Sequence, residues 1–428
     1  MELSRRLLLR AGLAGAAGTA FTAAGCSTSP KSGGSGSTSK TTTLWYWGGG
    51  LSDKVVADAV THFASSTTVK PSIIGGDFKQ KLVTTMSSGG QFVPDITGIK
   101  GEDMASFIPN ANKFVDLNTL GADKLASQYL PWKWKKGSTK DGKVVGFPID
   151  IGPTATFYRQ DLFAKAGLPT DPAAVSAAIS TWDAYFELGV TLKKGANAFL
   201  VNNIGSIFST AIGQPSTRFI DENEKFVGDQ DHMHSAWTTA VKPYQLGIDA
   251  KINDDSWNAA IASGGIAAEV GAAWHALDIS QAGPGTKGKW RVAATPVGPA
   301  NIGGSFLSIP KTSSNPDAAF QVLTWILNPD NQAKGFTDAA LFPSSPATYK
   351  MSALTSPDEF FGGQVTIDVF GPAAEKIPVQ YESAADAAVS APYFSELTNI
   401  ETKGKKPDQA WADAVSQAKQ IAQRQGVN

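Results

Sequence analysis

After residue 42 the sequence alternates between short strand-like runs and helix-like segments, with glycines between them. The run 43–47, Thr-Leu-Trp-Tyr-Trp, is rich in strand formers and is followed by three glycines and by Ser52, a predicted helix N-cap. Strands are also predicted over 69–74 and from residue 96, and helices after Asp77 and over 102–108. Strands that alternate with helices in this way predict an α/β fold with a doubly wound sheet.

The rest of the chain continues the pattern with longer connections. Further strands are predicted over 144–150, 155–158 and 198–201, and residues 219–227 predict a hairpin. Four signals predict helix starts, namely Ser180-x-x-Asp183 (with an end at Gly195), Asn315-Pro316-Asp317, Asn328-Pro329-Asp330 and Pro407. The sequence has no internal repeat of roughly 20 to 50 residues and no heptad run, so a solenoid or coiled coil is not expected.

Charge and composition limit the possible partners. The chain has 428 residues, enough for roughly two to four domains, and its 42% apolar content excludes disorder of the whole chain. Lys plus Arg number 37 and Asp plus Glu number 38, so the net charge of −1 offers no general attraction to nucleic acid. No nucleic-acid partner is therefore expected, whereas 11 tryptophans supply flat apolar faces for a small ligand.

Residues 1–25 are interpreted as an export signal. Arg5 and Arg6 precede a mildly apolar run that ends at Gly25, and this arrangement resembles a twin-arginine signal peptide. A permanent transmembrane helix is the alternative. It is disfavoured because the run is glycine-rich and contains threonines, whereas about 20 predominantly apolar residues are needed to span a bilayer.

Cys26 is the only cysteine of the chain, so neither an intrachain disulfide nor a cysteine-based metal site can form. The preceding Ala23-Ala24-Gly25 makes this stretch resemble the cleavage box of bacterial lipoproteins, in which the cysteine carries the lipid. Ala23 departs from the usual Leu, and an incidental cysteine after a cleavable signal is the alternative. Residues 26–43 are rich in Ser, Thr and Gly and are expected to be a flexible linker from a membrane anchor to the folded body.

Several short motifs along the mature chain together resemble one known family, although none is diagnostic alone. They are Leu44-Trp45-Tyr46-Trp47, Lys81-Leu82, Pro94-Asp95, Phe114-Val115-Asp116-Leu117, residues 141–148, residues 157–169, Thr181-Trp182-Asp183, residues 264–274, Gly303-Gly304-Ser305, residues 315–319 and residues 409–414. In this order and spacing the chain resembles the extracellular solute-binding proteins, family 1, of bacterial ATP-driven (ABC) carbohydrate importers, the group that includes maltodextrin-binding proteins.

The resemblance implies a two-lobed α/β fold of the type II periplasmic-binding-protein kind, with several chain crossings at a hinge and the ligand in a cleft between the lobes. Lobe 1 is expected over 41–149 plus 307–349, and lobe 2 over 150–306 plus 350–428. The implied function is that of a monomer without cofactor. It would capture a mono- or oligosaccharide by hinge closure and deliver it to an ABC transporter permease at the outer face of the cytoplasmic membrane.

A sugar offers hydroxyls to planar polar groups and C–H patches to aromatic faces, so such side chains at strand ends are the candidates for its site. Trp47 ends the first predicted strand, just before three glycines. Asp150 lies at the first predicted crossing, where it could bind a hydroxyl or only fix the hinge. Gly303 and Gly304 could let the backbone approach the ligand or only form a bend.

The other candidates come from their positions relative to the family. Trp274, with His275 beside it, lies where the family carries a stacking aromatic, and Lys100 and Glu102 match positions that often hold polar ligand groups. Each could instead be a core or surface residue. The weaker aromatic candidates are Trp257, at a predicted helix start, and Phe342, before a proline.

Other functions have less support from the sequence. No Gly-x-Ser-x-Gly elbow, Walker loop or dinucleotide fingerprint is present, so an enzyme is not expected. A glycan-active enzyme, which needs two carboxylates about 5 to 10 Å apart, is a further alternative that no spacing in the sequence favours. His232 and His234 raise the alternative of a metal-binding lipoprotein, but residues two apart on a helix point to different faces, so no metal site is expected. A binder of a polyol, peptide or other polar solute in the same fold is the main alternative. Tyr381 is the only aromatic between Pro378 and Tyr393, which leaves the ligand size open.

Overall fold

The computed structural model describes residues 40–88, 92–252 and 255–428. The predicted export signal with Arg5 and Arg6, the lipidation site Cys26 and nearly all of the predicted linker lie outside the described residues. Among the helices that the described residues form, none is both long and apolar enough to cross a lipid bilayer.

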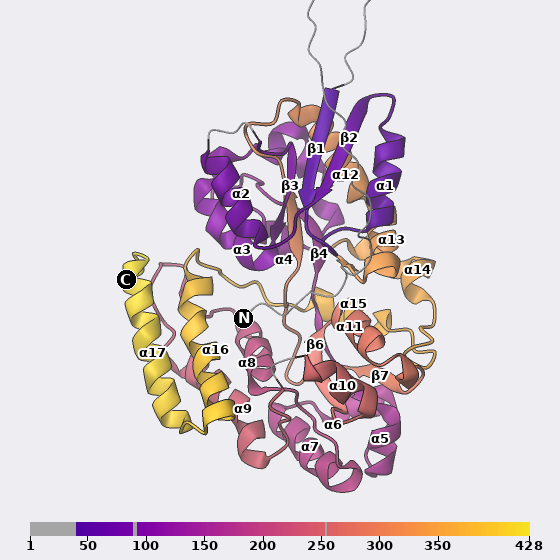
Figure 1. Cartoon of the computed structure of the whole chain (residues 1–428), viewed down its shortest axis with the longest axis vertical. Helices are drawn as coiled ribbons and strands as arrows, with labels where there is room; N and C mark the ends of the chain where they lie inside the picture. Colours follow the sequence, from indigo (N-terminus) through magenta and orange to yellow (C-terminus); the bar gives the residue numbers. More distant parts are fainter. Residues whose placement is uncertain (1–39, 89–91, 253–254) are drawn as a thin grey trace, which may run out of the picture. The chain divides into compact units, whose positions relative to one another are not determined.

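The larger of two β-sheets has six strands and mixed direction (Figure 1). Its order is β2 (Thr67–Ile73), β1 (Lys40–Tyr46), β3 (Ile96–Lys100), β8 (Ser305–Ser308), β4 (Phe147–Ile151) and β9 (Phe342–Pro343). Only the β2–β1–β3 part is parallel, and the pairs of β8 and β9 are antiparallel. The doubly wound sheet predicted from the alternation is therefore wrong for β8 and β9, because these strands enter the sheet only after long excursions of the chain.

Helices cover both faces of this sheet, and alternate strand residues point to each. One face packs Leu44 and Tyr46 of β1 against α1 (Asp53–His62) and α12 (Pro316–Ile326). On the other face Trp45 of β1, Trp47 just after it and Ile99 of β3 pack with residues of α2 (Phe78–Ser87) and α3 (Gly101–Phe107). Because successive side chains of a strand alternate between faces, β1 contributes to both cores.

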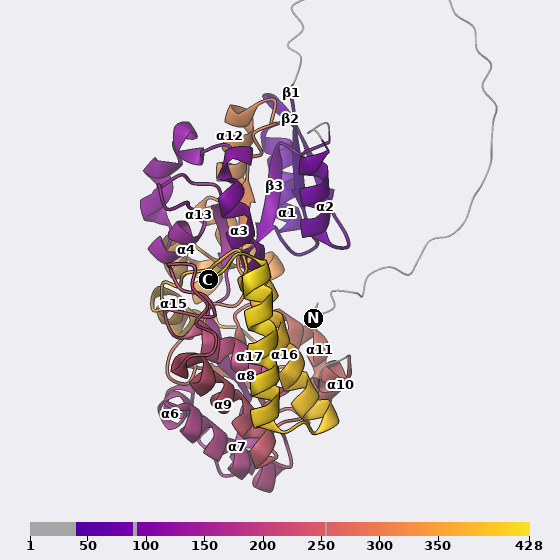
Figure 2. The same cartoon turned by 90° about the vertical axis from the view of Figure 1, so that its left-hand side faces the viewer.

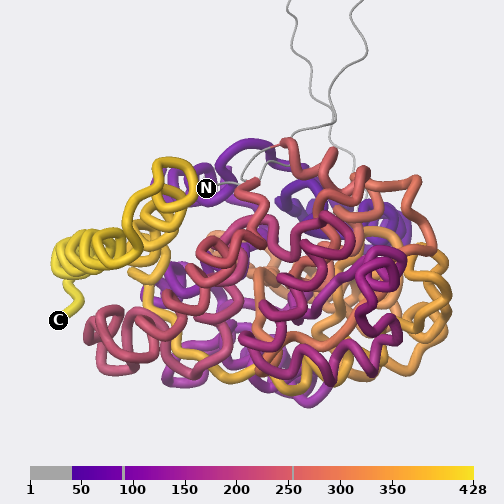
Figure 3. Tube along the Cα trace, turned by 90° about the horizontal axis from the view of Figure 1, so that it is seen from below, coloured from indigo at the N-terminus to yellow at the C-terminus, as the bar shows by residue number. Residues whose placement is uncertain are grey.

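The second sheet has three antiparallel strands in the order β6 (Ala268–Ala272), β5 (Thr154–Arg159), β7 (Trp290–Ala293). Helices surround it. The C-terminal helices α16 and α17 lie side by side (Figures 2 and 3), and α16 packs against α8. The helices of this part are α5 (Gln160–Lys165), α6 (Pro172–Ala178), α7 (Trp182–Ala196), α8 (Ile204–Gly213), α9 (Asp231–Leu246), α10 (Ser256–Ser263), α11 (His275–Ala282), α15 (Ile367–Glu375), α16 (Asp386–Lys403) and α17 (Pro407–Arg424).

The chain passes between the two sheets more than once. Residues 152–153 lead from β4 to β5, and residues 294–304 lead from β7 back to β8. After β9 the chain enters the region of α15 to α17. The remaining helices are α4 (Pro131–Lys136), α13 (Pro329–Ala339) and α14 (Ser352–Thr355), with short 3-10 turns over 108–113, 117–120, 122–128, 284–286 and 346–350.

Most of the predicted helix caps are confirmed. The side chains of Ser52, Asp77, Asn315 and Asn328 each accept a hydrogen bond from a backbone N–H in the first turn of the helix that follows. The helix start predicted at Ser180 is wrong by one residue, because the Thr181 hydroxyl caps α7.

Two other local predictions are wrong. Helix α7 ends not at Gly195 but at Asn197, which adopts the left-handed conformation that closes the helix. The strand predicted over 198–201 is reduced to isolated bridges at Phe199 and Val201, since Asn203 already caps α8. The hairpin predicted over 219–227 is present as a single antiparallel bridge between Ile220 and Phe226.

Asp95 ties the start of β3 to two other segments. Its Oδ2 accepts hydrogen bonds from the backbone N–H and the hydroxyl of Thr43, at 2.9 and 2.7 Å, and its Oδ1 accepts from Ser313 Oγ at 2.8 Å and from the Ser314 N–H at 3.2 Å. The residue is only 9% exposed. One carboxylate therefore satisfies four donors that would otherwise be left without an acceptor.

We expect Asp95→Ala to lower the free energy of unfolding by about 2–4 kcal/mol, because it leaves these donors unsatisfied. Urea denaturation followed by circular dichroism measures this. Asp77→Ala is the matched control, since it removes one exposed cap and should cost only about 1 kcal/mol. Equal losses in the two variants would contradict the central role of Asp95.

Candidate functional site

The segment Ile302-Gly303-Gly304 brings residues of both sheets together. A Cβ atom at Gly152 would lie 1.9 Å from the Ile302 carbonyl oxygen, and one at Gly101 would lie 2.1 Å from the Gly304 oxygen. Such distances are shorter than any real contact, so only glycine fits at 101 and 152. Gly303 and Gly304 themselves have φ of 81° and 80°, a conformation that favours glycine.

Three of the predicted residues lie at the ends of β1 and β3. Trp47 is 9% exposed, and its ring packs over Gly98 and edge-on against Phe78. The ammonium of Lys100 lies 5.8 Å from the centre of the Trp47 ring. Glu102, in the first turn of α3, is exposed. These residues therefore offer one exposed carboxylate and one partly exposed ammonium next to an indole.

Asp150 is the penultimate residue of β4 and is 5% exposed. Its neighbour Lys133, from α4, is fully buried. The Lys133 ammonium group has no hydrogen-bond partner among the described residues and lies 3.5 Å from the centre of the Phe306 ring. Burial and the charge of Lys136 lower the pKa of Lys133 well below its ordinary value, while Asp150, Glu382 and Glu102 act in the opposite direction. Lys133 was not among the residues predicted from the sequence.

On the side of the second sheet, Trp274 is fixed to the Ile302 segment. Its indole N–H donates to the Ile302 carbonyl at 3.1 Å, and the ring is partly exposed. A Cβ atom at Gly303 would lie 3.5 Å from the same indole nitrogen. The segment 302–304 thus joins Trp274 to Gly101 and Asp150, so residues predicted from distant parts of the sequence share one neighbourhood.

His275 and Trp257 belong to a network that is centred on Glu269, a buried residue of β6. One oxygen of Glu269 accepts from the Trp257 indole N–H at 2.8 Å, and the other lies 2.8 Å from His275 Nε2. His275 Nδ1 lies 3.3 Å from Asp278. Burial opposes a charge on this histidine, but the bonds to Asp278 and Glu269 outweigh it and raise the pKa of His275 to about 9. The His275 ring also contacts the rings of Trp257 and Trp274, with centroid distances of 5.1 and 6.0 Å.

Phe342 of β9 pairs with Ile151 of β4, next to Asp150, but its side chain is part of the core. Its side chain is fully buried and packs against Phe336, Tyr349 and Phe370, so it is a core residue in this structure. Of the two histidines of the metal alternative, His232 is bonded to the Arg218 carbonyl oxygen and His234 packs against Trp411. Within residues 40–88, 92–252 and 255–428 no cluster of His, Cys, Asp or Glu is arranged to hold a metal ion.

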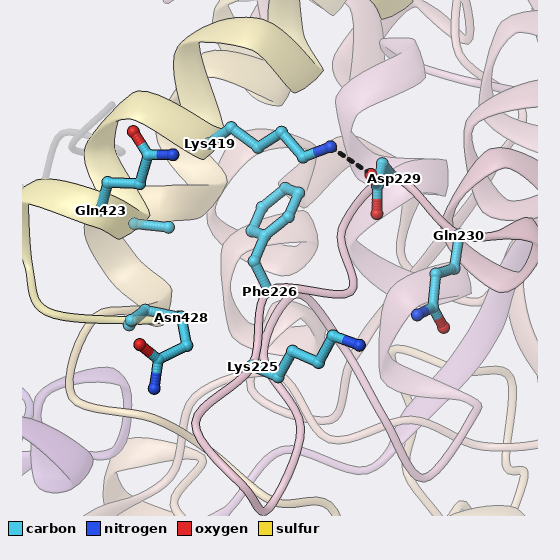
Figure 4. A pocket seen from close by; sticks show the side chains of 9 residues that line it. Lys225, Phe226, Asp229, Gln230, Lys419, Gln423 and Asn428 are labelled. Atoms are coloured by element: carbon cyan, nitrogen blue, oxygen red, sulfur yellow. Dashed lines mark hydrogen bonds and ion pairs between the residues drawn. The ribbon is translucent and has the colours of Figure 1, made fainter.

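Two surface cavities flank the hairpin at 219–227, and His232 lines one of them. The first, of about 510 Å³, has Phe226 as its floor and is bordered by an ion pair between Lys419 and Asp229 at 2.6 Å (Figure 4). The second, of about 430 Å³, shares Lys225 and Gln230 with the first. Neither contains a residue predicted to bind ligand.

Two residues close to the candidate site, Lys133 and Glu269, were not predicted from the sequence. Lys133 stands in Trp132-Lys133-Trp134, and a single charged residue between two tryptophans of a short helix was a usable sign of a buried charge. Glu269 follows Ala267-Ala268 in an apolar strand, where a lone carboxylate must find partners.

Comparison with known proteins agrees with this geometry. A family model of the bacterial extracellular solute-binding protein matches residues 59–361. The chain belongs to this family. A crystal structure of an extracellular solute-binding protein of family 1 superposes on this solute-binding protein with a TM-score of 0.82 and 28% identity, covering 90% of this chain and 100% of the other. The fold is thus the two-lobed periplasmic-binding-protein fold.

Two relatives with assigned ligands cover most of this solute-binding protein. The lactose-binding protein of Rhizobium radiobacter is 25% identical over 376 residues, which are 82% of this chain and 86% of the relative. The arabinooligosaccharide-binding protein of Bacillus subtilis (strain 168) is 25% identical over 334 residues, 71% of this chain and 72% of the relative. Both are named as binding proteins of sugars, and neither is named as an enzyme.

The raised pKa of His275 predicts a pH-dependent stability. The pKa of a histidine in an unfolded chain is about 6.5. The stabilisation from the charge of His275 is therefore fully present below that pH and is lost as the pH rises through about 9. We expect the difference in unfolding free energy between wild type and His275→Gln to be at most about 3 kcal/mol at pH 6 and to shrink towards pH 10. Denaturation curves across this range measure it. A difference that does not change with pH would contradict the assignment.

Proposed function

We propose that this solute-binding protein captures a mono- or oligosaccharide and delivers it to the permease of an ABC transporter. The observation that carries the proposal is the Ile302–Gly304 segment, which places the partly exposed ring of Trp274 near Asp150 and near the start of α3. Aromatic faces next to carboxylates and amines are the groups that hold neutral sugars. The names of the sugar-binding relatives support the same ligand class.

The proposed site consists of residues from both sides of the Ile302–Gly304 segment. Phe342, a candidate from the sequence, is not part of the proposed site, because its side chain is fully buried in the core. The proposed ligand-binding residues are Trp47, Lys100, Glu102, Asp150, Trp257, Trp274, His275, Gly303 and Gly304. Of these, Trp257 and His275 act mainly by holding the frame around Glu269. No cofactor is part of the proposal.

Capture is proposed to work by hinge closure. The lobes are proposed to be residues 41–149 plus 307–349 and residues 150–306 plus 350–428, with the ligand between them. A sugar that contacts both lobes favours the closed conformation by its differential affinity, and closure must be reversible for delivery. The ligand-binding space in such a protein depends on the conformation, so the two surface cavities near residues 219–227 do not define it.

A thermal-shift screen of the purified full-length protein tests the ligand class, with sugars, polyols, amino acids, short peptides and divalent metals as probes. We expect stabilisation by one series of sugars, because a ligand at 100 times its dissociation constant adds about 2.7 kcal/mol to the folded state. We further expect Trp274→Ala to weaken binding of that sugar by about 1–3 kcal/mol, by analogy with stacking on other planar ligands. Calorimetry measures the affinity.

Trp325→Ala is the control for this variant. Trp325 is a partly exposed tryptophan of α12 that packs on His62, so its loss should leave sugar affinity unchanged. An unchanged affinity in Trp274→Ala would remove Trp274 from the site. A response to peptides or polyols but to no sugar would replace the ligand class while leaving the fold in place.

The protein is also proposed to be an extracytoplasmic lipoprotein that is exported through Arg5 and Arg6 and anchored through Cys26, and to act as a monomer. The support is the motif Ala23-Ala24-Gly25-Cys26 and the extracellular character of the family. We expect radiolabelled fatty acid to enter the wild-type protein in its bacterial host and not the Cys26→Ser variant. Label retained in Cys26→Ser would rule out this anchor.

A further inference from the structure

Successive side chains of the short helix α4 contact three different later segments of the chain. The Trp132 indole N–H donates to the Ala374 carbonyl oxygen of α15 at 3.1 Å. Lys133 lies over the ring of Phe306 in β8. Lys136 forms an ion pair with Glu382 at 2.8 Å. Helix α4 therefore contacts β8, α15 and the segment at Glu382 at once.

The ion pair between Lys136 and Glu382 is shielded from solvent. The two side chains are 16% and 14% exposed, and Arg218 NH1 lies 3.5 Å from the same Glu382 oxygen. Burial opposes the charge of Glu382, but Lys136 and Arg218 outweigh it and lower its pKa. Removing one partner of a shielded ion pair leaves the other charge with less compensation in surroundings where water cannot replace it, which is costly.

A second contact runs parallel to this pair. The ammonium of Lys140 donates to the Glu222 carbonyl oxygen at 3.2 Å and lies 5.3 Å from the centre of the Tyr381 ring. The hydroxyl of Tyr381 is itself bonded to Glu224. Residues 136–140 thus make two contacts in this region: Lys136 pairs with Glu382, and Lys140 contacts Glu222 and Tyr381.

The pair is also electrostatically connected to the proposed sugar site. Lys133, one turn before Lys136 on α4, interacts with the charges of Glu382, Asp150 and Glu102. Asp150 and Glu102 belong to the proposed ligand-binding residues, whereas Glu382 does not. Replacing Lys136, the partner of Glu382, therefore changes the electrostatic potential at Lys133, which links the ion pair to the proposed site.

We infer that Lys136 and Glu382 are positioning residues for ligand capture, and that their ion pair stabilises the ligand-holding conformation and breaks when the protein opens. The inference rests on the proposed function, in which Lys136 belongs to lobe 1 and Glu382 to lobe 2. An N–O distance of 2.8 Å cannot persist when the segments that carry the two atoms move apart. The pair therefore has a different energy in the two conformations, which is the requirement for shifting their populations.

The test measures opening without a ligand. Two spin labels are placed on exposed residues, at Lys124→Cys near the first sheet and Thr238→Cys on α9, in the full-length protein with Cys26→Ser, which removes its only native cysteine. We expect the distance distribution of the ligand-free protein to shift towards longer distances in Glu382→Gln. Lys136→Met should give a smaller shift, because Glu382 keeps Arg218 as a partner. Lys136→Arg, which preserves the pair, should retain the wild-type distribution.

The matched control is Asp183→Asn, which breaks the ion pair of Lys242 and Asp183 at 2.7 Å, both from the part around the second sheet. It should change neither distances nor affinity. In sugar titrations we expect Glu382→Gln to weaken binding by about fivefold or more, and Lys136→Arg to retain wild-type affinity. Circular dichroism checks that each variant is folded, and Lys136→Met carries the test if Glu382→Gln does not fold.

A distance distribution that stays unchanged in the folded Glu382→Gln and Lys136→Met variants would overturn the inference. So would an equal shift in Asp183→Asn, because the effect would then not be specific to this pair. The spin-label distances need no sugar. Failure of every sugar to bind the wild-type protein would therefore count against the proposed function alone, whereas the distances judge the ion pair.

Discussion

The close approach of backbone to backbone at Ile302-Gly303-Gly304 is the constraint on which the site depends. Its carbonyl oxygens occupy the space that Cβ atoms at Gly101 and Gly152 would need, so two chain crossings and the start of α3 meet without intervening side chains. Any larger residue at 101 or 152 would push these segments apart. Trp274 then bonds to the same segment, so its position follows from the glycines rather than from its own helix.

Much of the fold could be predicted from the sequence because its signals are local. The caps at Ser52, Asp77 and Asn315 depend on one side chain and the next turn, and all three were found. Strand direction is not local. β8 pairs antiparallel with β3 and β4 after an excursion of more than a hundred residues, and no feature of Ser305–Ser308 indicates from which end it enters the sheet.

The candidate site was predicted in part, for a related reason. Trp274, Asp150 and the paired glycines stand at strand ends and turns, where residue type and position already indicate a role. Lys133 and Phe342 show the limit. Lys133 is a buried lysine and Phe342 a buried aromatic residue. From the sequence, a buried lysine looks the same as an exposed one, and a core aromatic looks the same as one in a binding site. Only the packing of distant segments distinguishes these cases.

The charges around the proposed site bear on the kind of ligand that it suits. The buried carboxylates Glu269 and Glu382, next to the proposed site, have His275 and Lys136 at 2.8 Å, whereas Glu102 of the site is exposed to solvent. A solute with its own charge would need an opposite charge that the protein has not already compensated, since burying an uncompensated charge is costly. A neutral solute only has to exchange hydrogen bonds with these groups. Charge compensation within the protein therefore favours a neutral sugar over an amino acid or a charged peptide.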